Sequence, residues 1–156
     1  MPRPHSVTLD RDISIKLSDG TVTYADHYRP SGGDKNPVLL QRTPYNKETA
    51  AGFALRAAGA GYNVIVQDTR GRWASEGDFH AFRNEQQDGH DTCAWIVDQP
   101  WSNGRIGMWG GSYVGATQWQ AAIEHPPGLT TITPTATFSS FYRNLYLGGA
   151  VRLSLI

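Results

Sequence analysis

Cysteine and net charge are both scarce in this sequence. Cys93 is the one cysteine among 156 residues, which excludes an internal disulfide and fits a reducing compartment. The 14 basic and 14 acidic residues are mixed along the chain and leave a formal net charge of +0. No basic field is available to attract nucleic acid or anionic lipid, so neither is expected as a partner.

Long apolar runs are missing as well. The start, Met1–Ser6, lacks the apolar core of a signal peptide, and no run approaches the roughly 20 residues of a membrane span. With 39% hydrophobic residues, the chain is still long enough to bury a real core. We therefore expect a soluble, cytoplasmic domain that does not contact membranes.

The pattern of β-favouring residues changes along the chain. Short runs at Ser6–Leu9, Ile13–Leu17 and Thr21–Tyr28, with Ser18-Asp19-Gly20 between the last two, predict opening antiparallel strands and a hairpin. From Pro37 on, buried strands alternate with helices, which predicts a parallel sheet covered on both faces. The strands expected there are Val38–Leu40, Tyr62–Gln67, Arg105–Trp109 and Thr130–Thr135.

Three helices are expected between these strands. The first covers Glu48–Ala60, with an inner face of Ala51, Ala54, Leu55 and Ala58. Asn84 caps the second, with Gln87 reaching back, and its inner face is Gly89, Cys93, Ile96 and Val97. The third follows Ser112 and runs to about Glu124, before Pro126-Pro127. No element is predicted for the tail, Phe138–Ile156.

Ser112 lies on a glycine hinge between a predicted strand and a predicted helix. Gly110, Gly111 and Gly115 supply the small residues that such a sharp turn needs, although Val114 stands where the usual pattern has its second glycine. A serine lifted above the sheet beside a helix N-terminus is typical of a nucleophile in acyl transfer. The alternatives are an ordinary glycine turn and a dinucleotide fingerprint, which a side chain at position 112 disfavours.

Three ordered motifs together resemble one family. They are Gln41–Lys47 (QRTPYNK), Val66–Gly77 (VQDTRGRWASEG) and Gly110–Gln120 (GGSYVGATQWQ). In order and spacing they are similar to the cocaine esterase and X-prolyl dipeptidyl-peptidase (CocE/NonD) family of α/β-hydrolases, from about Val7 to Ala136. In that family the turn that carries the serine, called the nucleophile elbow, resembles Gly-x-Ser-Tyr-x-Gly. This pattern accommodates Val114.

The resemblance implies a fold, a chemistry and three site residues. The fold is the N-terminal half of an α/β-hydrolase: antiparallel opening strands, then parallel β/α units just past the elbow. Ser112 matches the nucleophile, the Tyr45 hydroxyl matches an oxyanion-hole donor, and Tyr113 supplies the backbone N–H beside the serine. The reaction needs no metal or organic cofactor, and the partner is a small ester, amide or X-Pro peptide substrate. Oligomeric state is left open.

Other polar and aromatic residues have two interpretations. Asp68 and Arg70 follow a strand and either wall the pocket or, as we expect, form turn hydrogen bonds and ion pairs. Trp73, Phe79 and Phe82 either line an acyl pocket or pack, and packing is favoured. His90 with Asp88 and Asp91 suggests a metal site, but solvated residues in a helix's first turns explain them better.

A histidine base and an orienting acid are not evident in this sequence. After Ser112 come only Glu124 and His125, which the helix would place roughly 18 Å away. His80 and His90 precede the serine, against the family order. We therefore expect residues 1–156 to be a partial catalytic domain without its cap and C-terminal β domain, inactive alone and marginally stable. The alternative is a catalytically dead chain that acts as a binding or interaction module.

Overall fold

The computed structural model describes residues 5–33 and 35–152. Residues 1–4, 34 and 153–156 lie outside this description. Residues 1–4 include most of the start, for which no signal peptide is expected, and residues 153–156 are the last four of the tail.

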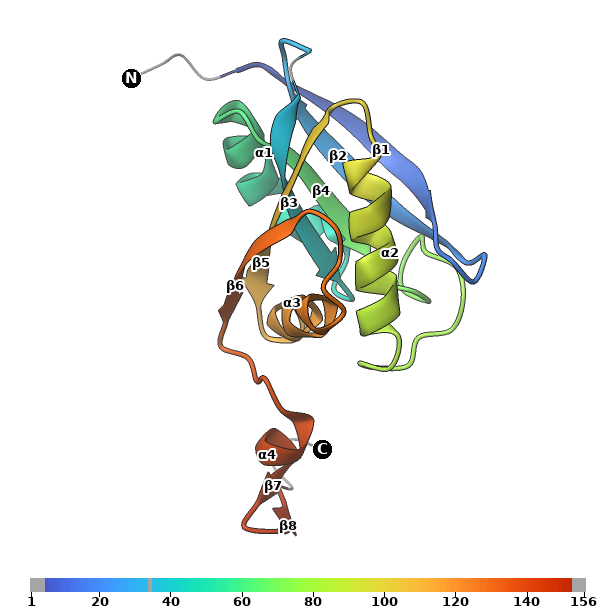
Figure 1. Cartoon of the computed structure of the whole chain (residues 1–156), viewed down its shortest axis with the longest axis vertical. Helices are drawn as coiled ribbons and strands as arrows, with labels where there is room; N and C mark the ends of the chain where they lie inside the picture. Colours follow the sequence, from blue (N-terminus) through green and yellow to red (C-terminus); the bar gives the residue numbers. More distant parts are fainter. Residues whose placement is uncertain (1–4, 34, 153–156) are drawn as a thin grey trace.

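Six strands form one mixed sheet (Figure 1). Its spatial order is β1-β2-β4-β3-β5-β6, with β1 and β2 antiparallel to their neighbours and the other four strands parallel. The bounds are β1 Val7–Lys16, β2 Val22–Pro30, β3 Asn36–Thr43, β4 Asn63–Asp68, β5 Ser102–Gly111 and β6 Leu129–Thr135. Both the opening hairpin and the later parallel sheet are confirmed.

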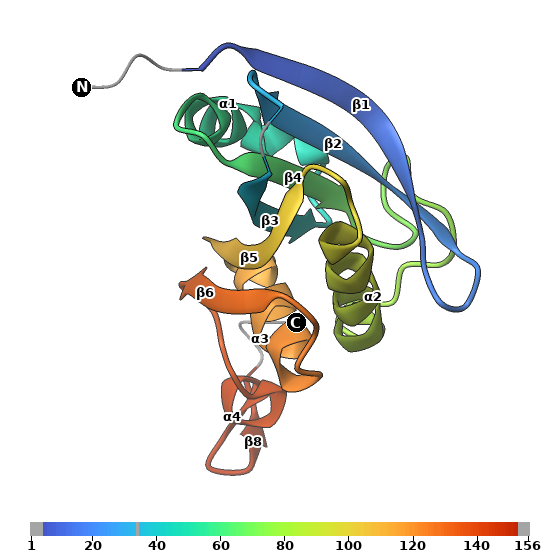
Figure 2. The same ribbon diagram turned by 45° about the horizontal axis from the view of Figure 1, so that its top comes forward.

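Helices cover the two faces of the sheet. A 3₁₀ turn, η1 (Lys47–Ala50), leads into α1 (Ala51–Gly59) on one face, while α2 (Glu85–Val97) and α3 (Tyr113–Ile123) cover the other (Figure 2). Parallel strands are joined by right-handed crossovers, so the reversal of strand order at β3 sends α1 to one face and α2 and α3 to the other. Beyond β6, the short helix α4 (Phe141–Leu145) and the strands β7 (Tyr146–Leu147) and β8 (Ala150–Val151) extend away from the sheet (Figure 1).

Alternate residues of the central strands fill two separate cores. On β4, Ile65 faces α2 and α3, while Val64 and Val66 face α1. Cys93 lies in the first core as a free thiol, and burial raises its pKa to about 12. A parallel sheet buried on both faces requires such unbroken apolar strands, which is why the sequence pattern locates them well.

Three details of the predicted elements are wrong. The first two runs form one strand, β1, interrupted by a bulge between Asp10 and Ile13. Leu55 is 48% exposed, so α1 buries only Ala54 and Ala58. At α2 no side chain caps the helix, and Gln87 instead donates a hydrogen bond to Asp91.

Within the described residues, no helix is long and apolar enough to cross a membrane.

Candidate active site

Ser112 alone makes the turn between β5 and α3. Its φ of 56° and ψ of −125° lie where residues with a side chain are rarely found. The Ser112 N–H donates to the Thr135 carbonyl of β6 at 3.0 Å, and its carbonyl accepts from Gly115 and Ala116 at 3.0 and 3.1 Å. The residue is exposed. The strained turn is thus held by the neighbouring strand and by the helix that follows.

Two glycines next to this turn leave no room for a Cβ. A Cβ on Gly110, which has a φ of 132°, would overlap the Val114 side chain, and one on Gly115 would come within 2.6 Å of Thr137. Val114 is buried, so its side chain occupies the space above Gly110. Position 115 must be small because Thr137 lies against it, whereas position 114 has room for a side chain.

Tyr45 is brought to the same end of the sheet. It follows β3, which is the neighbour of β5, at the point where helices pass to opposite faces of the sheet. Such a switch point leaves a crevice at the carboxyl ends of the strands, the usual place for a ligand site in open α/β sheets. The Tyr45 side chain is 50% exposed, and its ring lies 6.3 Å from that of Tyr113, edge to face.

Tyr113 is buried, unlike the serine before it. Its hydroxyl donates to Glu85 Oε1 at 2.8 Å and accepts from the Phe82 N–H at 2.9 Å. Burial and the Glu85 carboxylate raise the pKa of Tyr113 well above its usual range, so the phenol stays neutral. Tyr113 is also the first residue of α3, where N–H groups have no partner within the helix. Its side chain is therefore anchored while its backbone N–H stays available beside Ser112.

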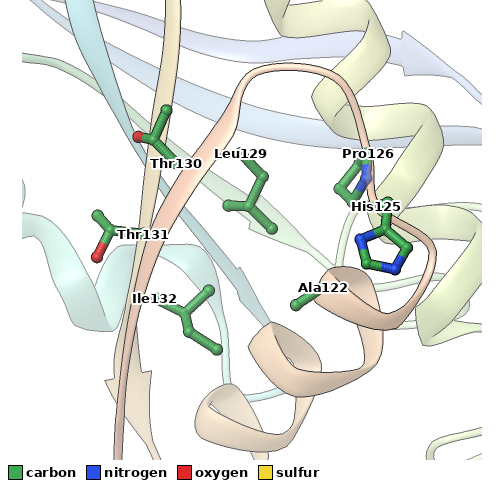
Figure 3. A pocket seen from close by; sticks show the side chains of 7 residues that line it. All are labelled: Ala122, His125, Pro126, Leu129, Thr130, Thr131 and Ile132. Atoms are coloured by element: carbon green, nitrogen blue, oxygen red, sulfur yellow. The ribbon is translucent and has the colours of Figure 1, made fainter.

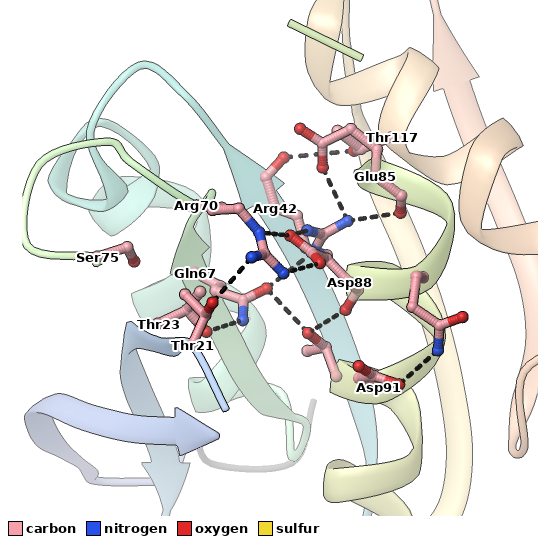
Figure 4. A network of polar contacts seen from close by, with 12 residues as sticks. Thr21, Thr23, Arg42, Gln67, Arg70, Ser75, Glu85, Asp88, Asp91 and Thr117 are labelled. Carbon is pink, nitrogen blue, oxygen red and sulfur yellow. Dashed lines mark hydrogen bonds and ion pairs between the residues drawn. The ribbon is translucent and has the colours of Figure 1, made fainter. Parts of the chain in front are cut away.

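A buried polar network joins β3 and β4 to α2 (Figure 4), and Glu85 connects this network to Tyr113. The Arg42 side chain, fully buried at the end of β3, donates to Gln67 Oε1 at 2.9 Å and to the Glu85 carbonyl at 3.0 Å. Its guanidinium also lies 2.9 Å from Glu85 Oε2. Neither Arg42 nor Glu85 is predicted as a site residue from the sequence. A charged residue within a buried strand is the signal that could have found Arg42, because such a charge needs partners.

Arg70 and Asp88 form a second ion pair of this network. Arg70 binds the Asp88 carboxylate through Nε at 3.0 Å and through a terminal nitrogen at 2.7 Å, and it also reaches Asp19 at 2.6 Å. Buried Asp68 binds Lys47 Nζ at 3.2 Å. The expected turn and ion-pair role of Asp68 and Arg70 is confirmed. The view of Asp88 as solvated is wrong, because Asp88 is buried between arginines.

The three aromatic residues of the long loop differ from one another. Phe82 stacks on Tyr113 with ring centroids 4.0 Å apart, and Phe79 lies 6.0 Å from the same ring. The prediction that Phe79 and Phe82 are packing residues is therefore confirmed. Trp73 is 60% exposed, so for it packing is the wrong explanation.

Comparison with known proteins agrees with this geometry. The family model described as X-Pro dipeptidyl-peptidase (S15 family) matches residues 19–156. The chain belongs to this S15 family. Its fold is that of the CocE/NonD α/β-hydrolases, and this membership replaces the dinucleotide-binding alternative for the glycine motif.

Individual relatives of this S15-family chain are hydrolases. The cocaine esterase of Rhodococcus sp. (strain MB1 Bresler) is 37% identical over 150 residues, which cover 92% of this chain and 26% of that protein. Among solved structures, an α-amino acid ester hydrolase superposes with a TM-score of 0.77 at 26% identity, covering 86% of this chain and 26% of the other. A CocE/NonD family hydrolase from Staphylococcus aureus gives 0.72 at 27% identity, covering 81% and 27%. The chain thus spans about a quarter of their length.

The described histidines of this S15-family chain do not bond to the Ser112 hydroxyl. In residues 5–33 and 35–152, no histidine makes a hydrogen bond or an ion pair to the Ser112 hydroxyl. His125 lies past the last turn of α3, the helix that begins at the elbow, and His27 on β2 bonds to Asn63. Glu124 and His125, the two candidates that follow the serine, thus lie at the opposite end of α3 from Ser112.

A cavity of about 310 Å³ lies at the C-terminal end of α3, the end opposite Ser112 (Figure 3). It is bounded by the end of α3, the following loop and β6, and Leu129 and Ile132 project into it opposite Ala122 and His125. Since α3 separates it from Ser112, this cavity is not part of the candidate site.

Proposed function

We propose that this chain carries the nucleophile and the oxyanion hole of a serine hydrolase. The observation that carries the proposal is the exposed serine at a strained strand–helix turn, at the switch point where the loop after β3 also delivers Tyr45. Family membership supports hydrolysis, and the site's geometry supports serine as the attacking group.

The chemistry proceeds through an acyl-enzyme. The Ser112 oxygen attacks the carbonyl carbon and loses its proton to a histidine base, while the carbonyl electrons move onto oxygen. The Tyr45 hydroxyl and the Tyr113 N–H donate to this oxyanion, and each such donor lowers the barrier by about 3 to 4 kcal/mol. The oxyanion then collapses, the leaving group departs with the proton from the base, and water releases the acyl group by the reverse sequence.

The base and its orienting acid come from polypeptide outside residues 1–156. We assign these residues to the N-terminal part of a catalytic domain whose cap and C-terminal β domain lie elsewhere in the complete protein. The substrate is an acyl ester or an X-Pro peptide, since both pass through the same acyl-enzyme. No metal or organic cofactor takes part in these steps.

Replacement of the serine tests this proposal in the complete natural protein. Ser112→Ala should abolish covalent labelling by a fluorophosphonate and lower kcat for p-nitrophenyl esters or X-Pro p-nitroanilides by up to about 10⁶-fold. Ser31→Ala, in an exposed turn, is the matched control and should keep both the labelling and the turnover. Retained turnover in Ser112→Ala would overturn the proposal. A natural protein that neither labels nor turns over would instead favour the binding-module alternative.

A further inference from the structure

The backbone just before Tyr45 is held by an unusual pair of donors. The Pro44 carbonyl accepts a hydrogen bond from Trp73 Nε1 at 3.0 Å and another from Arg72 Nε at 3.1 Å. Both donors come from the segment after β4, nearly thirty residues further along the chain. A carbonyl with both lone pairs engaged has little freedom to rotate, so the peptide plane entering Tyr45 is fixed.

The segment that supplies these donors is itself rigid. Its backbone folds into tight turns through bonds from Gly71 to Glu76 at 2.9 Å and from Ser75 to Arg72 at 2.9 Å. The Ser75 hydroxyl donates to the Asp68 carbonyl at 2.7 Å, and Glu76 donates to β2. The donors are therefore in place before any substrate arrives, which is the condition for preorganised positioning.

A tryptophan at position 73 is energetically unfavourable unless it has a specific role. Its backbone has a φ of 52°, and the residue is 60% exposed. An exposed indole on strained backbone is not explained by packing. Its hydrogen bond to the Pro44 carbonyl is the contact that distinguishes it from Phe79 and Phe82, the other aromatic residues of this loop, which pack against Tyr113.

A second anchor follows Tyr45. The Lys47 N–H donates to Asp68 Oδ1 at 2.8 Å, and Lys47 Nζ binds Asp68 and Asp12 at 3.2 and 2.9 Å. Tyr45 thus lies between two clamped points, while its own ring is half exposed. The location of its hydroxyl is set by the backbone on either side more than by side-chain packing.

We propose that Arg72 and Trp73 are positioning residues that hold the Pro44 carbonyl and thereby aim the Tyr45 hydroxyl at the oxyanion. This inference rests on the proposed function, because it assigns a role to Tyr45 in catalysis. Displacement of a catalytic group by about 1 Å can cost about 10²-fold in rate, so a lost anchor should be visible in kinetics.

A double-mutant cycle in the complete natural protein tests the inference. Trp73→Phe removes the indole N–H but keeps a ring, and it should lower kcat/KM about tenfold for an ester through kcat, with KM nearly unchanged. Tyr45→Phe alone should cost about 10²–10³-fold. In the Tyr45→Phe background Trp73→Phe should cost less than about twofold, since the group it positions is already gone.

Two further variants separate the outcomes. Trp119→Phe, a half-exposed tryptophan on α3, is the matched control and should leave kcat unchanged. Arg72→Gln removes the second donor and should show the same non-additivity with Tyr45→Phe. Equal losses of kcat/KM in the parent and Tyr45→Phe backgrounds would overturn the inference. It would also be overturned if neither Trp73→Phe nor Arg72→Gln lowered kcat/KM. Failure of the proposed function shows differently, as activity that survives Ser112→Ala.

Discussion

Ser112 shows how neighbouring contacts maintain a torsion that the residue itself disfavours. The Thr135 carbonyl holds its N–H, and the first turn of α3 holds its carbonyl. The glycine pattern predicts this turn because only small residues can surround it. The anchoring of the Tyr113 phenol by Glu85 was not predictable, since the two residues are 28 positions apart and belong to different elements.

His27 should make stability depend on pH. It is buried on β2, its Nε2–H donates to Asn63 Oδ1 at 3.0 Å, and its ring lies 4.1 Å from that of Trp101. Burial lowers the pKa of His27 from 6.5 to about 4. Between these values the unfolded chain binds a proton that the folded chain excludes, so stability falls as the pH falls through this window.

The loss should amount to at most about 3 kcal/mol between pH 7 and pH 4. Urea denaturation of the complete protein across this range should show a steeper acid loss for the parent than for His27→Gln. His125→Gln, at an exposed position, should keep the parent's slope. Identical slopes in the parent and His27→Gln would contradict the assignment of this titration to His27.

At the scale of elements, α2 and α3 pack closely because Gly89 has no side chain. A Cβ there would come within 2.7 Å of the Ala121 Cβ and 3.3 Å of the Arg42 guanidinium. Gly89 was predicted on the inner face of its helix from periodicity. That it lies against Ala121 could not be predicted, because periodicity orients a helix without naming its partner.

Gly89→Ala should therefore destabilise the protein by about 1–3 kcal/mol through overpacking. Gly52→Ala on α1 is the matched control, since its Cβ would meet only the Arg56 side chain at 3.8 Å. That change should stabilise the protein by about 0.4–1 kcal/mol, because it restricts the unfolded chain. Urea midpoints of the two variants should move in opposite directions, and a shared direction would refute the packing account.

At the scale of the whole molecule, the two edges of the sheet differ. The β1 edge carries Asp10, Arg11 and Asp12 together with a bulge, features that discourage strand addition. The β6 edge has no charged residue from Leu129 to Thr135, and a cavity of about 310 Å³ adjoins it on the face shown in Figure 3. Tyr62 borders another cavity of about 310 Å³, which also reaches β6.

The polypeptide of residues 1–156 should therefore self-associate through β6 when produced alone. Thr131→Lys, at an exposed position of β6, should shift the population toward monomer in sedimentation velocity. Thr8→Lys on β1 adds the same charge at the opposite edge and should change little. A clean monomer with a cooperative two-state melt would rule out both the association and the marginal stability.

The alternation of strands and helices from β3 to β6, the two buried faces of the central strands and the turn at Ser112 could all be predicted from the residues alone. Each of these depends on local periodicity or on the size of adjacent residues, which are legible along a single chain. The position of β3 between β4 and β5, which brings Tyr45 beside Tyr113 at the elbow, emerges only when the sheet assembles. The contact of Trp73 with the Pro44 carbonyl emerges at the same level, because long-range contacts depend on how strands and loops meet in space.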